Sequence, residues 1–451
     1  MGVAERTADM AELWMLRGMS PRVRRAFSPE FRDFWLIVGN GVLFRLYFEV
    51  FNPKRVIAAF LTELTGQEWV VGLALAAPVL FAAVPTLYYS YRMETAPQRM
   101  PYYALGARIK WMSQLALLLS VFLLAGNPLL LALLFVVTYG AFGLGDAMGI
   151  PAFGDVVART ILPRRRGRLF GFRVAIGGVL ALAIGVLISW ALRDPPPLAF
   201  PFNYLLLFGI AFVFLVAAQF MFMRVHEPAL RHQLEAPPPL RRYLGNAWRM
   251  MLADRNARYY ILYRNLSPLA WTPAAFLIPY ALKELGMSGA VVGYIVTTSV
   301  IASSISNLFW GSMGDRRGNH QVIRSSTLWL LVSAIGLALT PLLVGRIGAG
   351  WLLGWLLLVN MIGEVSLVGM GNGGINYQYD LAPDDRVPVY VAAINTAAAP
   401  VQILAPLAIG AALMVWGYAL VFWAGVGFSL VAFLGTLQLG DPRQTALSRR
   451  R

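Results

Sequence analysis

Long apolar segments separated by short polar ones run along nearly the whole chain. A helix needs about 20 mostly apolar residues to cross the hydrocarbon core of a membrane, and each of these segments reaches that length. The pattern therefore predicts an all-α membrane protein with twelve membrane-spanning helices. In the first half of the chain the predicted spans are 34–64, 68–91, 102–125, 128–156, 169–192 and 200–223. In the second half they are 257–283, 289–313, 323–344, 350–376, 388–414 and 416–439.

The two halves of the chain repeat one another. The matched positions are Pro53 with Pro273, Glu63-Leu64 with Glu284-Leu285, and Val70-Val71-Gly72 with Val291-Val292-Gly293. A duplicated apolar chain of this kind is typical of secondary transporters, whose substrate site lies between the halves. The predicted organisation is a tail at 1–32, a six-helix bundle at 33–224, a polar linker at 225–256, a second six-helix bundle at 257–440 and a tail at 441–451.

Composition supports a membrane protein and narrows its chemistry. The chain is 58% hydrophobic and only 13% charged, whereas soluble domains carry about 25% charged residues. It has no cysteine, and its three histidines all fall in polar segments, so we expect neither a metal site nor a catalytic centre. No bound cofactor is expected either.

The net charge of +16 is distributed as a topology signal. Most Lys and Arg lie in the tails, the linker and the alternate loops 92–110, 159–173 and 316–324, whereas few lie in the opposite loops. Basic loops stay on the cytoplasmic side of a membrane. We therefore expect both termini in the cytoplasm, lipid as the surrounding medium and no nucleic-acid partner. The short loops favour a bacterial inner membrane.

A polar loop between the eighth and ninth spans carries a recognisable motif, Gly311-Ser-Met-Gly-Asp315-Arg316-Arg317-Gly318. It resembles the G-x-x-x-D-R-x-G loop of the major facilitator superfamily. The resemblance covers nearly the whole chain and implies the fold of that family, with transport by alternating access. It also implies a conformational latch at Gly311, Asp315, Arg316 and Gly318.

The corresponding loop of the first half, residues 90–101, keeps only a carboxylate, Glu94, and has lost the glycines. A latch role for Glu94 is therefore an open expectation. The alternative for Asp315 is that it simply caps the loop.

Small residues at spacings of four predict where the halves meet. The fifth span offers Gly177, Ala181 and Gly185, and the eighth offers Thr298, Ala302 and Ser306. In the superfamily these two spans pack across the interface between the halves. Ordinary packing inside each bundle is the alternative.

The first span holds a dense set of ionisable residues. Arg45 and Glu49 are four apart and share a helix face. If the span continues to residue 64, then Lys54 and Arg55 lie near its middle, where ionisable residues are costly and mark functional sites. If instead the span ends near Phe51, both lie in an outer loop.

Other ionisable candidates are Asp146, Arg264 and Glu364. Together with the residues of the first span they are expected to line a central cavity for substrate or coupling ion. Asp146 is open to two interpretations: it carries a proton, or it pairs with Arg45 and is structural.

Amides and phenols in the tenth and eleventh spans can orient polar ligands through hydrogen bonds. Because residues 376–390 approach a cytoplasmic loop, a gate or a cap of that loop is an equal alternative to substrate contact. The candidates are Asn376, Tyr377, Arg386, Tyr390 and Asn395.

The leading functional hypothesis is a monomeric secondary transporter of a small organic solute, with the proton as a candidate coupling ion. One alternative is a transport fold that has lost transport and acts as a sensor or scaffold, suggested by the degraded loop at 90–101. The other is a membrane enzyme acting on a lipid-linked substrate through Asp380, Asp384 and Asp385.

Overall fold

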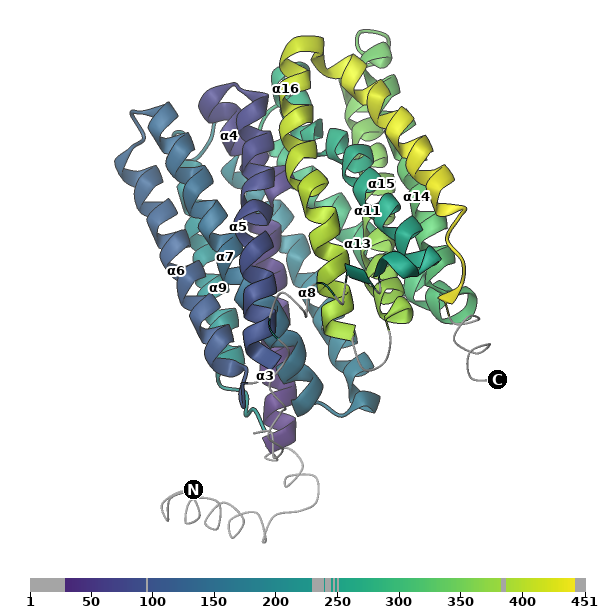
Figure 1. The fold of residues 1–451 in the computed structure, drawn as a ribbon. Helices are drawn as coiled ribbons and strands as arrows, with labels where there is room; N and C mark the ends of the chain where they lie inside the picture. The colour runs from purple at the N-terminus through teal and green to yellow at the C-terminus, as the bar shows by residue number, and fades with distance from the viewer. Residues whose placement is uncertain are drawn as a thin grey trace.

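The computed structural model describes residues 29–94, 96–228, 239, 245, 248–249, 251–382 and 387–442, and Figure 1 shows their arrangement. The first half forms α3 (Pro29–Val50), a π-helical turn η1 (Pro53–Ile57), α4 (Ala58–Thr65), α5 (Glu68–Glu94), α6 (Met100–Leu123), α7 (Pro128–Thr160), α8 (Pro163–Ala191) and α9 (Phe202–Met223). The second half forms α11 (Arg255–Trp271), a 3₁₀ turn η2 (Thr272–Phe276), α12 (Leu277–Lys283), α13 (Ala290–Arg317), α14 (Asn319–Leu343), α15 (Ala349–Leu381) and α16 (Val387–Thr436).

Every predicted span coincides with helical structure, and the fold is all-α over the described residues. Two predicted spans lie within α16, which is divided by a turn at Gly417 with φ 71°. Among the described residues, nine helical stretches are long and apolar enough to cross a membrane. α6 and the 17-residue α11 are not among the nine, so membrane crossing by all twelve spans stays a prediction.

Two boundaries differ from the sequence-based ones. The first helix begins at Pro29, so residues 29–32 belong to it rather than to the tail. α8, the helix of the fifth predicted span, begins at Pro163, six residues before that span, because a proline suits the first helical turn. Arg165 and Arg168 of this added segment are exposed. Most of the linker and both tails lie outside the described residues.

The first helix of each half is interrupted at its matched proline. Pro53 opens η1 and Pro273 lies in η2, since proline lacks the amide hydrogen that a continuous helix needs. The side chain of Asn52 accepts a hydrogen bond from the Lys54 amide at 3.0 Å and thus caps the resumed helix. The first span therefore continues after the break, and Arg55 is buried, which excludes an outer loop at this position.

The repeat extends to the contacts between the halves. α5 packs against α16, and α8 packs against α13. A Cβ atom on Gly72 would lie 2.3 Å from the carbonyl oxygen of Pro406, and one on Gly293 would lie 2.4 Å from that of Gly185. The glycines of the two Val-Val-Gly motifs thus allow the same close helix approach at matched places.

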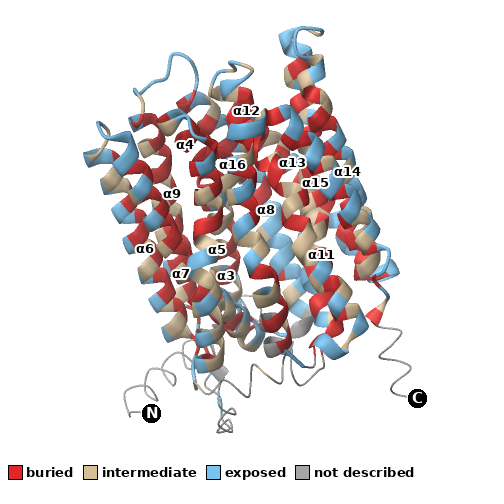
Figure 2. Ribbon diagram, turned by 45° about the horizontal axis from the view of Figure 1, so that its top comes forward, coloured by how far each residue is buried: buried red, intermediate tan, exposed pale blue. Residues whose placement is uncertain are grey.

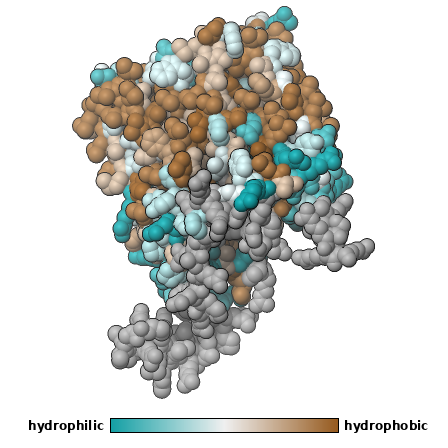
Figure 3. All heavy atoms as spheres, in the orientation of Figure 1, coloured by the Kyte–Doolittle hydropathy of each residue, from teal (hydrophilic) through white to brown (hydrophobic). Residues whose placement is uncertain are grey.

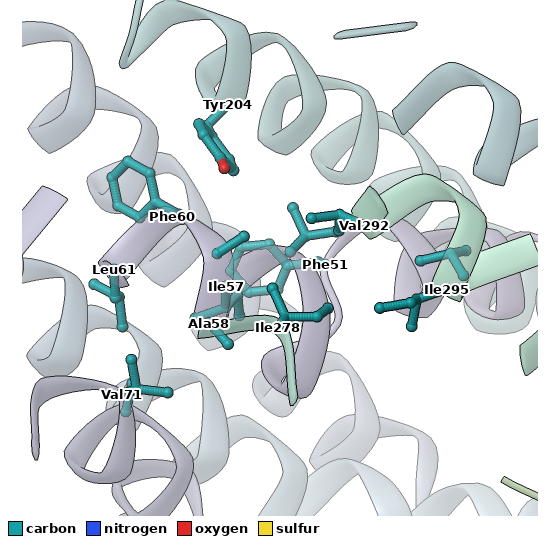
Figure 4. Close-up of a cluster of buried hydrophobic side chains, with 14 of the residues drawn as sticks. Phe51, Ile57, Ala58, Phe60, Leu61, Val71, Tyr204, Ile278, Val292 and Ile295 are labelled. Carbon is teal, nitrogen blue, oxygen red and sulfur yellow. The ribbon is translucent and has the colours of Figure 1, made fainter. Parts of the chain in front are cut away.

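These close contacts lie at one end of the bundle. We call the end at which α3 begins and α16 finishes the terminal end, and the opposite one the far end; in Figure 1 they are the lower and upper ends. A large apolar core at the far end joins both halves, as Phe51, Ile57 and Leu61 pack with Ile278 and Val292 (Figure 4).

The sides of the bundle are apolar and exposed. Pale-blue exposed positions follow the outward faces of the helices in Figure 2, and brown apolar side chains cover most of the face in Figure 3. Val84 and Leu308, for example, are 75% and 79% exposed. Such a surface needs lipid around it, so the chain is an integral membrane protein.

Candidate functional site

A chain of ion pairs joins the two halves inside the bundle. Glu49 accepts from Arg45 at 2.7 Å and from Arg55 at 3.0 Å, and Arg55 also contacts Glu364 of α15 at 2.7 Å. Arg45 donates to the hydroxyl of Ser303 on α13 at 2.9 Å. The sequence had predicted that Arg45, Glu49, Arg55 and Glu364 line a central cavity, and the structure instead joins them in one chain of ion pairs.

Local geometry explains this cluster. Arg45 and Glu49 meet because side chains four residues apart share a helix face. The break at Asn52 turns the chain so that Arg55 lies against the same carboxylate. Glu49 is buried with two guanidinium partners, which offset the cost of its charge in a dry environment. Lys54 takes a different direction and lies 3.8 Å from the ring centre of Trp271 in the second half.

Asp146 pairs with a residue that sequence reasoning missed. Its carboxylate is bonded by the ammonium of Lys110 from α6, and not by Arg45 as one interpretation expected. The lysine side chain is 5% exposed and the aspartate side chain 30% exposed, so the lysine is the more deeply buried of the pair. Lys110 had been counted among the loop residues 92–110, but α6 begins at Met100 and carries it inside the bundle.

A cavity with a volume of about 640 Å³ lies between the halves. Asp146 and Ile150 of α7 and Leu87 of α5 line it from the first half, and Asn395 and Gln402 of α16 line it from the second. Its lining reaches Met93, Arg99 and Asp155 near the terminal end, whereas the far end is closed by the contacts of α5 with α16 and of α8 with α13.

Several predicted cavity residues do not line this space. Glu49, Arg55 and Glu364 are held in the ion-pair chain instead, because their charges satisfy one another across the interface. Arg45 lines a separate, smaller pocket. Arg264 lies at the rim, where it donates to the side-chain oxygen of Asn395 at 3.3 Å.

The predicted gate residues separate in the structure. Asn395 lines the main cavity, but Tyr377 is fully buried and donates to the carbonyl of Gly440 at 3.0 Å within the second half. Tyr390 is also buried. Asn376 lines another pocket, beside Asp315. Arg386 lies outside the described residues.

The predicted latch loop ends α13. Gly318 adopts φ 86°, which favours glycine and turns the chain into α14. Asp315 and Arg316 are exposed, and the Asp315 carboxylate makes no hydrogen bond or ion pair with the described residues. A Cβ atom on Gly311 would meet no atom within 4 Å, so no close helix contact requires glycine at this position. Glu94 is the last residue of α5, and its side chain lies outside what the structure describes.

The small-residue stripes of the fifth and eighth spans meet only in part. Gly185 packs against Thr297, and Ser189 donates to the carbonyl of Ala290 at 3.2 Å across the interface. Gly177 instead faces Arg45 in its own half, and Thr298 faces Asn360 in its own half. The pairing of the two helices is confirmed, with some of the expected residues used for packing inside each half.

Of the three acidic residues of the enzyme alternative, Asp380 is the one in the described part of the chain. Asp380 accepts from the amide of Asn319 at 2.6 Å, which joins α14 to α15. Asp384 and Asp385 lie outside the described residues. Within the described part of the chain, no three His, Cys, Asp or Glu side chains gather closely enough to hold a metal ion.

Comparison with known proteins agrees with this geometry. The sequence profile of the Major Facilitator Superfamily matches residues 260–450. "Multidrug resistance protein MdtG" of Citrobacter koseri is 29% identical over 203 residues, which are 42% of this chain and 47% of that relative. The protein of the same name from Klebsiella pneumoniae is 27% identical over 37% of this chain and 40% of that relative. The chain thus matches about half the length of these relatives or less.

Among solved structures, a bacterial homologue of the iron transporter ferroportin in an outward-facing state superposes with a TM-score of 0.61. The two proteins are 16% identical, and the match covers 92% of this chain and 99% of the other, so the likeness shows a shared fold. The second half of this chain thus resembles the Major Facilitator Superfamily in sequence, and the chain shares its fold with a solved transporter.

Proposed function

We propose that this protein is a secondary transporter that moves a small organic solute across the membrane by alternating access. The observation that carries the proposal is the cavity of about 640 Å³ lined by both halves, with a sealed far end. A cavity between two repeated bundles is where such proteins bind their solute. In this conformation the solute would enter from the terminal end, which we propose to be cytoplasmic in a bacterial inner membrane.

The lining indicates an amphipathic solute. Apolar side chains such as Val79, Leu87 and Ile150 make most of the wall, with a few polar groups among them, notably Asp146 and Gln402. A mostly apolar pocket with a few placed polar groups is the usual form of a site for organic molecules. The names of the relatives, which refer to multidrug resistance, support this class of solute.

Asp146 is the proposed site of coupling within the cavity. Its carboxylate faces the space, and Lys110 holds it from behind. A proton or a polar group of the solute that reaches Asp146 would compete with Lys110 for the carboxylate. We therefore propose the proton as the coupling ion. We also propose that the protein works as a monomer.

Flux measured in proteoliposomes tests the proposal. We expect an imposed proton gradient to drive accumulation of an amphipathic dye without ATP. Asp146→Asn should lower the flux at least tenfold, about 1.4 kcal/mol in the barrier, because the exchangeable charge is lost. Glu30→Gln is the control, since Glu30 forms an exposed ion pair with Arg165 on the protein surface.

A double variant separates transport from folding. Asp146→Asn alone leaves Lys110 buried without its partner and should destabilise the protein, whereas Lys110→Gln combined with Asp146→Asn should recover the melting temperature. If the flux of the double variant recovers as well, Asp146 is structural. Binding of solutes by the wild type without any flux would instead favour the sensor alternative.

A further inference from the structure

Some basic side chains inside the helices have no acidic partner. Glu49, Asp146 and Glu364 hold Arg45, Arg55 and Lys110. Lys54, Arg173 and Arg264 have no carboxylate within 4.0 Å among the described residues, although Lys54 covers a Trp ring and Arg264 bonds an amide. Arg173 is the least compensated of the three, since its guanidinium makes no hydrogen bond with the described residues and its Nη1 atom is buried. A bare guanidinium inside a membrane protein is costly and therefore marks a site of function.

Arg173 lines a pocket of about 320 Å³ that the transport proposal does not use. Arg45 lines the same pocket, and its Nε atom is likewise buried without a partner. Both halves contribute, because Ser304 and Asn307 come from α13. Phe153 of α7 forms part of the wall, while Ile150 on the same helix faces the main cavity.

The sequence makes room for Arg173 in a specific way. A Cβ atom on Gly41 of α3 would lie 1.7 Å from the Nε atom of Arg173, so the arginine side chain crosses the helix where it has no side chain of its own. The guanidinium then lies 4.9 Å from the ring centre of Phe153 and 5.3 Å from that of Phe170. The aromatic rings fix its orientation but do not neutralise its charge.

These features together specify a ligand. Guanidinium groups bind carboxylates and phosphates through paired hydrogen bonds, and the polar groups of α13 add further partners. Phe48, Phe170 and Val174 line the same pocket and are all more than a third exposed, which leaves apolar surface beside the charges. We propose that this pocket binds the carboxylate or phosphate head of an anionic amphiphile, with its apolar chain along these side chains. Such binding does not require that the protein transport the ligand.

Binding of dodecyl phosphate to the purified protein tests the proposal. In a neutral detergent, dodecyl phosphate should raise the melting temperature in a saturable way, because it binds the folded form. Arg173→Gln should weaken the apparent affinity at least tenfold, since hydrogen bonds to a charged group are lost. Arg173→Lys keeps the positive charge but loses the planar guanidinium group. Its apparent affinity should therefore lie between those of the wild type and Arg173→Gln.

Arg168→Gln is the matched control. It removes an equal charge from the same helix at an exposed position, so its affinity for dodecyl phosphate should equal that of the wild type. Equal affinity of wild type and Arg173→Gln would overturn the proposal, and so would an equal loss in Arg168→Gln, which would indicate general attraction to a basic protein. If inorganic phosphate binds as tightly as dodecyl phosphate, the apolar chain contributes nothing to binding and the proposal of an amphiphilic ligand is wrong.

Competition identifies the natural source of the anion. If phosphatidylglycerol displaces dodecyl phosphate from the wild type, the head group belongs to a membrane lipid. If it does not, the ligand is a single-chain anionic amphiphile. Both results support the proposed chemistry. Because binding is measured without flux, the proposal can fail while transport stands, or stand while transport fails.

Discussion

The two ends of the bundle differ in how the halves meet. At the far end, α5 meets α16 and α8 meets α13 through glycines, and an apolar core continues from one half into the other. Toward the terminal end the same halves are separated by the main cavity, and the carboxylate of the latch loop, Asp315, has no partner among the described residues. The two halves of the chain are therefore in contact at the far end and apart at the terminal end.

The difference between the two ends shows which contacts must break for the far end to open. Closing the far end buries apolar surface and aligns the ion-pair chain from Glu49 through Arg55 to Glu364, so opening it must disrupt both. At the terminal end the described residues form no such core between the halves, and this end would close through another kind of contact. The absence of cysteine from the chain makes each end separately testable, because a single introduced cysteine labels without background.

The largest effect is expected where the helices approach most closely. Gly72→Leu would place a side chain against the backbone of Pro406 and should disfavour the closed far end by about 3 kcal/mol. A cysteine introduced at the buried Ala74 should then react with a soluble thiol reagent about a hundredfold faster. Gly209→Leu is the control, because a Cβ there meets no atom within 4 Å. Unchanged labelling in Gly72→Leu would mean that this contact does not seal the far end.

A smaller effect is expected from the ion pair that joins the halves. Glu364→Gln removes the cross-interface partner of Arg55 but leaves Glu49 in place, so the closed far end should lose about 1–2 kcal/mol. Labelling of the same Ala74 cysteine should rise about tenfold, and the exposed-pair variant Glu30→Gln should change it by less than about threefold. A Glu364→Gln protein that labels like wild type would show that the apolar core alone holds this end shut.

The sequence predicted the helices well and matched Pro53 with Pro273, where the first helix of each half is interrupted, because hydrophobic length and proline act locally. It also predicted the proximity of Arg45 and Glu49, which share a helix face. It missed Lys110 and Arg173, since both were counted with the basic loops that indicate topology. Whether a cation near a helix end points outward or into the bundle depends on the rotation of that helix against its neighbours, and a single sequence does not record that rotation.

The smallest effect on stability is expected at Asp315. Its substitution also tests most directly how the terminal end differs from the far end. Since its carboxylate is exposed and unpartnered in this conformation, Asp315→Asn should change the free energy of unfolding by less than about 0.5 kcal/mol. If the loop is a latch, the carboxylate gains a partner only when the terminal end closes, so the variant should spend more time open there. A cysteine at Thr396, which lines the cavity, should then react faster than in wild type, whereas one at Ala74 should react more slowly. If Asp315→Asn and the wild type are labelled at the same rate at Thr396, and also at Ala74, then Asp315 caps its loop and the terminal end closes by other contacts.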